Sequence, residues 1–225
     1  MPTVLLVRHG QASFGSDDYD VLSEVGHRQA ELVAASLAER GYRPTRLISG
    51  TLRRQRETAE AFVANGAPDL EIDPRWDEFD SEDVLHHHSE AAVRLQGNPE
   101  GEAPTNRAFQ AVLEPALAQW VDHAESSPAD QTWPQFSSAG SAALADLSSQ
   151  LTSGETAIVV TSGGTISALL GNLWGTPADL FSHLNRVLVN SSVTKLAVGS
   201  TGTNVISFND HSHLESVDRA LVTYR

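Results

Sequence analysis

Short apolar runs alternate with segments of helical periodicity in the first third of the chain. Residues 4–7 are typical of a buried strand, and a helix is predicted between the capping residue Ser23 and the stop signal Gly41. A regular alternation of strand and helix predicts a parallel sheet with right-handed crossovers. The other elements predicted in this part are a strand at 46–49, a helix at 52–64 and a strand at 70–72.

The middle of the chain lacks this alternation. Gly97, Pro99 and Gly101 interrupt any regular element, and the two prolines in residues 126–138 indicate a loop. We expect one domain over residues 1–225, in which roughly residues 81–134 form a helical cap or insertion over a site. A peripheral helical decoration is the alternative. The helices predicted here and just beyond are 108–123, kinked by Pro115, and 144–151.

Strands and helices alternate again in the last third. Residues 156–161 are predicted to be a buried strand, and the helix expected at 165–173 packs on the sheet. A short helix is predicted at 177–183, followed by strands at 186–189, 193–198 and 205–208.

Composition narrows the class of protein. The chain has 225 residues, which suits a single α/β domain. It has no cysteine, which excludes disulfides, thiolate nucleophiles and cysteine metal sites. It also shows neither a membrane-spanning run nor a basic and then apolar leader, so we expect a cytoplasmic protein. The net charge of −14 argues against nucleic-acid and anionic-membrane partners.

The strongest chemical signal is the tripeptide Arg8, His9 and Gly10 at the end of the first strand. Ligands of α/β sheets bind at the carboxyl ends of strands. The guanidinium of Arg8 suits phosphate, and a neutral imidazole at His9 is a nucleophile near pH 7. A strand that ends in ordinary polar residues, with a structural histidine, is the alternative. Within an acidic chain, Arg53, Arg54 and Arg56 supply a second basic cluster near a predicted strand end.

Further motifs follow in a fixed order: residues 21–30, 49–59, 76–80, 158–166 and 190–194. Together with the first tripeptide, this set resembles the histidine phosphatase superfamily, which includes the phosphoglycerate mutases. The resemblance spans nearly the whole chain. It implies a three-layer α/β/α sandwich with a mostly parallel central sheet, as in the phosphoglycerate mutases, and a small phosphorylated metabolite as partner. It implies no metal or nucleotide cofactor, and the oligomeric state stays open.

The resemblance assigns roles to individual residues. His9 is the nucleophile that forms a phosphohistidine, which water then hydrolyses. Arg8 and Arg54 are the phosphate clamps; Arg54 is preferred to Arg53 because the family's ligand lies two positions after the leucine, here Leu52. Glu78 is the proton donor to the leaving oxygen, and the surrounding acids are expected to help it hold a proton. The expected phosphate- or substrate-binding residues are Gly10, Gln11, Ser13, Ser162 and Gly163, with turn capping as the alternative for Gln11 and Ser13.

One position departs from the family pattern. By alignment of the glycine pair, the family's second histidine falls on Ser162. Serine keeps a hydrogen-bond donor but loses the positive charge, while backbone N–H groups at Gly163 and Gly164 are still expected to face an anion. We therefore expect a slow or selective phosphatase.

The remaining histidines are predicted to lie outside the site. His27 is expected on an exposed helix face. His86, His87 and His88 are expected in a solvated loop rather than a metal site. His211 and His213 are expected in a C-terminal loop.

Two other functions stay open. A phosphoglycerate mutase is the second candidate, although the long substrate-gripping insertions typical of mutases are not evident after His9 or Glu78. A catalytically silent protein that binds a phosphometabolite or a protein partner is the third. The serine at position 162 favours the silent relative, whereas Arg8, His9, Arg54 and Glu78 together argue against it.

Overall fold

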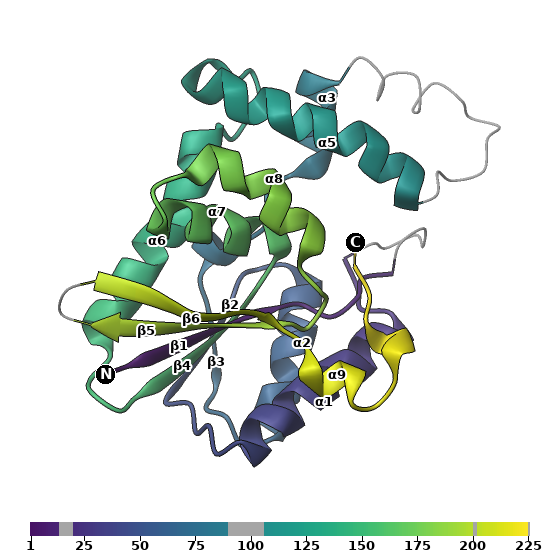
Figure 1. Ribbon diagram of the computed structural model, residues 1–225. Helices are drawn as coiled ribbons and strands as arrows, with labels where there is room; N and C mark the ends of the chain where they lie inside the picture. Colours follow the sequence, from purple (N-terminus) through teal and green to yellow (C-terminus); the bar gives the residue numbers. More distant parts are fainter. Residues whose placement is uncertain (14–19, 90–105, 200–201, 225) are drawn as a thin grey trace.

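The computed structural model describes residues 1–13, 20–89, 106–199 and 202–224. Its centre is a six-stranded sheet in the order β3-β2-β4-β1-β5-β6 (Figure 1). The first four strands along the chain run parallel, β5 is antiparallel to β1, and β6 is antiparallel to β5. The mostly parallel sheet predicted from the sequence is thus confirmed. The strands are β1 (Thr3–Arg8), β2 (Arg46–Ser49), β3 (Leu70–Ile72), β4 (Thr156–Thr161), β5 (Val193–Gly199) and β6 (Gly202–Asp210).

Helices cover both faces of the sheet (Figure 1). One face carries α1 (Glu24–Glu39) and α2 (Arg53–Ala64) and the other carries α6 (Trp133–Gln150), α7 (Gly163–Leu173) and α8 (Pro177–Val187). Beyond α7 and α8 lie α3 (Ser81–His88) and α5 (Asn106–His123). The short elements are the 3-10 turns η1 (Pro74–Trp76), η2 (Ala124–Ser126) and η3 (Arg219–Leu221), and the helix α9 (Ser212–Glu215) beside α1.

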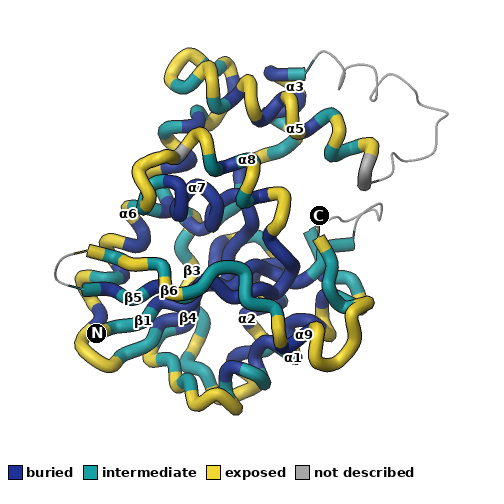
Figure 2. Tube along the Cα trace, viewed as in Figure 1, coloured by how far each residue is buried: buried dark blue, intermediate teal, exposed yellow. Residues whose placement is uncertain are grey.

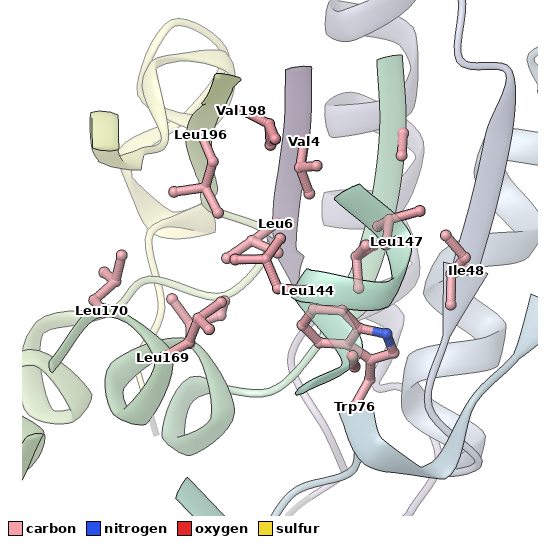
Figure 3. Packing of buried hydrophobic residues seen from close by; sticks show 14 of the residues in the cluster. Val4, Leu6, Ile48, Trp76, Leu144, Leu147, Leu169, Leu170, Leu196 and Val198 are labelled. Carbon is pink, nitrogen blue, oxygen red and sulfur yellow. The ribbon is translucent and has the colours of Figure 1, made fainter. Parts of the chain in front are cut away.

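Alternating side chains of β1 divide the core between the two faces. Leu5 and Val7 pack against α1 and α2, whereas Val4 and Leu6 pack against α6 and α7. Figure 3 shows the second of these clusters, with Leu144 of α6 close to Leu6. Every residue of α7 from 163 to 171 is buried, and Figure 2 shows this helix as dark blue almost throughout. A helix enclosed in this way is mostly apolar, and its buried hydroxyls at Thr165 and Ser167 donate to the carbonyls of Asp77 and Gly163.

Aromatic side chains join α3 and α5 to the rest of the molecule. Phe79, Trp120, Trp133, Phe136 and Phe181 come from four different segments, since Trp133 and Phe136 both lie in α6, and neighbouring ring centroids lie 4.6–6.2 Å apart. Tilted and edge-to-face pairs at such distances each add roughly 0.5–1.5 kcal/mol beyond the burial of their area. The loop after η1, which contains Phe79, is therefore anchored.

The loop predicted at 126–138 is wrong in its second half, because α6 begins at Trp133. Thr132 and Gln135 form a reciprocal capping box, which satisfies N–H groups at the helix start. Pro134 lies in the first helical turn, where a missing N–H costs nothing. The predicted helix 144–151 is the second half of the same helix. The proline that indicated a loop is thus a helix-start signal.

The strand predicted at 186–189 is also wrong. Arg186 and Val187 form the end of α8, and Leu188 and Val189 are buried without strand pairing. The helix predicted at 177–183 simply continues to Val187. The break predicted at residues 97–101 lies outside the described residues.

The three consecutive histidines form the last turn of α3, not a solvated loop. Asp80 accepts hydrogen bonds from the N–H groups of residues 82 and 83 and so starts the helix. His88 is buried, and its Nε2 lies 2.8 Å from the Ser127 hydroxyl. Burial, with His123 and His87 nearby, lowers the pKa of His88.

No helix within the described ranges combines the length and the apolar character needed to cross a bilayer.

The predicted C-terminal loop is replaced by α9, where His211 is the N-cap and His213 lies inside the helix. His213 is 8% exposed. Burial lowers its pKa to about 4; Asp210 and the Ser191 backbone oppose the shift, and His211 and Arg40 add to it.

We expect the buried His213 to make the folded protein less stable as the pH falls. In the unfolded chain His213 takes up a proton near pH 6.5, whereas in the folded chain it is protonated only near pH 4. The stability from neutral His213 is therefore complete above pH 6.5 and falls progressively, by ~3 kcal/mol in total, between pH 6.5 and 4. Urea unfolding across this range measures the decline. A folded His213→Gln protein is expected to show a shallower decline than the exposed control His27→Gln, and equal slopes would contradict the assignment.

Candidate active site

The candidate residues lie at the carboxyl ends of adjacent strands. β1 ends at Arg8, paired in register with Thr161 at the end of β4. The His9 N–H donates to the Thr161 carbonyl over 2.8 Å. β2 ends at Ser49, just before the turn that leads into α2 and Arg54. Parallel strands thus bring together segments from positions near 9, 54 and 162, as expected for ligand sites of α/β sheets.

The ring of His9 has a defined hydrogen-bonding arrangement. Its Nδ1 lies 2.7 Å from the carbonyl oxygen of Gly10, and its Nε2 lies 3.2 Å from Nε of Arg54. A carbonyl only accepts, so Nδ1 carries the proton; the Arg54 Nε–H only donates, so Nε2 presents its lone pair. His9 is 5% exposed and Arg54 is 8% exposed. The imidazole is therefore held as the tautomer whose Nε2 is a nucleophile.

Gly10 is required by close contact between two backbone segments. A β-carbon at Gly10 would lie 2.4 Å from the carbonyl oxygen of Gly26, and one at Gly26 would lie 2.1 Å from the carbonyl oxygen of Gln11. The Gly10 N–H donates to the hydroxyl of Thr58 over 3.0 Å. The loop after His9 is thus pressed against the first turn of α1 and the side of α2.

Gln11 and Ser13 make local contacts. The side-chain oxygen of Gln11 accepts from the Ser23 hydroxyl over 2.8 Å, and the Gln11 N–H donates to Gln29 over 2.8 Å. The Ser13 N–H donates to the Val21 carbonyl over 2.9 Å. The described contacts of both residues therefore order the first loop and the start of α1.

Arg54 also contacts Asp20, a residue that sequence reasoning missed. Asp20 accepts from Nη1 of Arg54 over 2.6 Å and from the N–H of Arg53 over 2.7 Å. The N-cap residue of α2, Leu52, has no side-chain acceptor, so the carboxylate of Asp20 caps this helix from another loop. The apolar N-cap was the available signal that an acceptor must come from elsewhere. Arg53 and Arg56, the other members of the basic cluster, are exposed.

Arg8 is buried, and its Nη1 donates to the carbonyl of Leu188 at the end of α8. A β-carbon at Gly163 would lie 3.4 Å from Nε of Arg8 and 2.9 Å from Oδ1 of Asn185. Arg8, Gly163 and Asn185 therefore meet at the start of α7. Arg8 and Arg54 thus supply two buried guanidinium groups in a chain that is otherwise strongly acidic, and Arg54 contacts His9 directly.

The carboxylate of Glu78 sits on the first turn of α7. It accepts from the Gly164 N–H over 3.1 Å and from the Phe79 N–H over 3.3 Å. The N–H of Gly164, which the sequence assigned to an anionic ligand, is thus engaged by Glu78. The acids predicted to crowd Glu78 have partners of their own, since Asp77 accepts from the Thr51 N–H and hydroxyl and Asp80 caps α3.

Ser162 is fully buried, and its Oγ accepts from Nε2 of Gln55 over 2.9 Å. The same Gln55 amide donates to the carbonyl of Trp76 over 3.1 Å. Gln55 is a second residue that local sequence patterns did not single out. As the acceptor of this bond, Ser162 keeps its own proton for a further partner.

Three successive residues at the start of α7 link the candidates. Ser162 contacts Gln55, Gly163 adjoins Arg8, and the N–H of Gly164 donates to Glu78. His9 and Arg54 are in direct contact, whereas the printed contacts of Gln11 and Ser13 lie along the first loop. Within the described ranges, no cluster of three or more histidine or carboxylate side chains could hold a metal ion. The arrangement offers an imidazole lone pair, two guanidinium groups and a carboxyl group.

The sequence matches the family model of the histidine phosphatase superfamily (branch 1) over residues 4–211. No curated protein matches it significantly. Similar solved structures include Bacillus stearothermophilus YhfR, at 20% identity and a TM-score of 0.68, covering 95% of this chain and 100% of that one. A phosphoserine phosphatase of Entamoeba histolytica, solved with 3-phosphoglyceric acid, has 20% identity and a TM-score of 0.66, with the same coverage. A mycobacterial glucosyl-3-phosphoglycerate phosphatase has 20% identity and a TM-score of 0.63, covering 92% and 98%.

Proposed function

The chain belongs to the histidine phosphatase superfamily, and from this premise we propose that it hydrolyses a small phosphomonoester through a phosphohistidine on His9. The observation that carries the proposal is the fixed tautomer of His9. Its Nε2 lone pair lies 3.2 Å from a buried guanidinium, with Nδ1–H bound to a carbonyl. A nucleophile next to a cation that attracts phosphate suits phosphoryl transfer, which depends mainly on positioning and electrostatics.

In the first step, Nε2 of His9 attacks phosphorus and the bond to the leaving oxygen breaks. Glu78 gives its proton to that oxygen, so an alcohol departs and Nε2 carries the phosphoryl group. In the second step, water attacks phosphorus and the Nε2–P bond breaks. The proton lost by the water passes to Glu78, and inorganic phosphate leaves. Charge and protons balance over the cycle.

Arg8 and Arg54 hold the phosphoryl oxygens in this mechanism. Charge-assisted bonds from guanidinium to phosphate are strong and directional. Arg54 exchanges its contact with the His9 lone pair for a phosphoryl oxygen, while Asp20 continues to orient its Nη1. Gly10, Gln11, Ser13, Ser162 and Gly163 are the proposed supporting residues, with Gln11 and Ser13 ordering the loop. The single-domain organisation, with residues 81–134 as a cap, belongs to the same proposal.

A chromogenic aryl phosphate tests the proposed function. Release of phosphate in the absence of added metal supports a phosphatase. Isomerisation of 3-phosphoglycerate, in the presence of its bisphosphate primer, would instead favour a mutase. Binding of orthovanadate without turnover of any phosphomonoester would favour the silent relative, for which the serine at position 162 is the specific support.

Ser162→His is expected to raise turnover. Serine offers one neutral donor, whereas a histidine offers a donor with positive charge at the same strand end. Losing a preorganised donor costs on the order of 10²–10³ in rate, so restoring the charged part should raise kcat about 10-fold or more. Ser162→Ala is the matched control and should lower kcat, because it removes the hydroxyl. Both proteins are checked by thermal unfolding, since the site is fully buried. A folded histidine variant with unchanged or lower turnover would contradict the proposal that the serine at position 162 slows the reaction.

A further inference from the structure

A cavity of about 240 Å³ lies between α5, α8 and the C-terminal residues. Its lining includes Leu117 of α5, Ser182 and Asn185 of α8, and Tyr224. Figure 1 shows the C-terminus next to the end of α8 and below α5, in agreement with this lining. The volume is below the usual range for drug-sized ligands, so the cavity suits a small organic group.

The cavity adjoins the residues that hold Arg8 and His9. Asn185 lies next to Gly163 at the point where Arg8 also arrives. The helix that carries Ser182 and Asn185 ends at Val187, and the carbonyl of its C-cap residue Leu188 accepts from Arg8.

Hydrogen bonds also connect the C-terminal wall of the cavity to the backbone of His9. The Thr223 carbonyl accepts from the Asn190 N–H over 3.0 Å, and the next N–H, from Ser191, donates to the His9 carbonyl over 3.2 Å. Tyr224 follows directly after Thr223. A phosphate held by Arg8 beside His9 would therefore have this cavity next to it.

The charges in the cavity wall neutralise each other. Arg186 and Glu114 form a two-pronged ion pair across the cavity wall, with Nε–Oε1 at 3.0 Å and Nη2–Oε2 at 3.1 Å. A ligand with its own carboxylate would have to compete with Glu114 for this guanidinium. The other lining groups named above are neutral: a hydroxyl, an amide, a phenol and an apolar side chain.

The neutral polar side chains of the wall point to the kind of group that fits. Ser182 is partly exposed and offers its hydroxyl to a ligand hydroxyl, whereas the Oδ1 of Asn185 is buried beside Gly163 and lies behind the wall. The half-exposed ring of Tyr224 and the side chain of Leu117 offer apolar surface to the carbon skeleton of the same ligand.

We infer that this cavity binds the leaving group of the substrate, and that this group is neutral, rich in hydroxyls and about the size of a monosaccharide. The substrate class is then a sugar or polyol monophosphate rather than a phosphorylated carboxylic acid. The inference rests on the proposed phosphatase function of His9.

A matched pair of substrates tests the class. Glycerol 3-phosphate and 3-phosphoglycerate share a three-carbon skeleton and differ chiefly in a hydroxymethyl group against a carboxylate. We expect kcat/KM to be at least about 10-fold higher for glycerol 3-phosphate, and higher still for glucose 6-phosphate. An equal or higher value for 3-phosphoglycerate would overturn the inference.

Two substitutions test the location. Ser182→Trp fills the cavity and is expected to lower kcat/KM for glucose 6-phosphate at least about 10-fold. Inhibition by orthovanadate, which carries no leaving group, should change far less in the same variant. His183→Trp places the same bulk one residue away, at an exposed position of α8, and is the control. Tyr224→Ala, at a half-exposed residue that carries little risk of misfolding, should raise KM for glucose 6-phosphate several-fold. Equal behaviour of the two tryptophan variants, with no effect of Tyr224→Ala, would overturn the location.

Calorimetry separates this inference from the proposed function. Glucose 6-phosphate is titrated into His9→Ala protein with and without Ser182→Trp. Weaker binding in the double variant supports the cavity even if the wild-type protein hydrolyses nothing, in which case only the phosphatase proposal fails. Equal binding by both proteins would overturn the cavity alone.

Discussion

Replacing His9 with alanine is expected to lower phosphomonoester hydrolysis by at least about 10³-fold, because no phosphohistidine can then form. The two guanidinium groups and Glu78 remain, so the variant should still bind orthovanadate. His9 lies in a loop after β1, and its ring contacts Arg54 and the Gly10 carbonyl, so the sheet does not depend on it. Initial rates with an aryl phosphate measure the loss, and a thermal unfolding curve checks the fold.

His27→Ala is the matched control, since His27 is exposed on α1 and outside the site. The covalent intermediate is sought separately by mixing wild-type protein with substrate, quenching in alkali and analysing the peptide that contains His9 by mass spectrometry. A phosphorylated imidazole survives alkali and is lost in acid, unlike a phosphate ester of serine. If His9→Ala keeps more than a tenth of the activity, the nucleophile is another group.

Much of the fold could be predicted because its signals are local. β1 and β4 are buried on both faces, so each is a continuous apolar run that needs no knowledge of its neighbours. The start of α1 was equally clear, since Ser23 accepts from the N–H of Gly26 within one turn. Gly41, with φ of +84°, follows the end of that helix in the left-handed region that favours glycine.

The errors arose where two local signals conflict. Pro134 is typical both of loops and of first helical turns, and only the reciprocal bonds of Thr132 and Gln135 decide for the helix. Leu188 and Val189 resemble a strand because they are apolar. They are buried by packing after α8, however, and not by strand pairing. Tertiary burial therefore overrode the local pattern at this position.

The residues of the candidate site also fall into two groups, those that local sequence signals reveal and those that they do not. Arg8, His9 and Gly10 could be singled out because they are consecutive and follow a strong strand. Asp20, Gln55 and Asn185 could not, because each acts on a residue that is distant in sequence: Asp20 on Arg54, Gln55 on Ser162, and Asn185 beside Gly163. The reason for glycine at position 10 was also hidden, since it depends on the carbonyl of Gly26.

Gly164→Ala is expected to lower kcat by about 100-fold or more by displacing Glu78. A β-carbon at this position would lie 2.1 Å from Oε1 of Glu78 and 2.7 Å from Cε1 of Phe79. The Phe79 ring is fixed in the aromatic cluster, so the carboxyl group must move away from the N–H of Gly164. A positioned general acid contributes typically 10²–10⁴-fold, and overpacking should also cost about 1–3 kcal/mol of stability.

The dependence on the leaving group separates loss of the acid from general damage. An aryl oxide leaves readily without a proton, whereas an alkyl oxide does not, so both Gly164→Ala and Glu78→Gln should slow alkyl phosphates far more than aryl phosphates. Gly140→Ala is the control. Gly140 lies in α6, and a β-carbon there would meet only Cγ2 of Thr165 at 3.5 Å, an ordinary contact. This change should leave turnover unaltered and stabilise the helix by up to about 1 kcal/mol. If Gly164→Ala slows both substrate types equally, Glu78 does not protonate the leaving oxygen, and the role of that carboxylate is to fix the start of α7 through the Gly164 N–H.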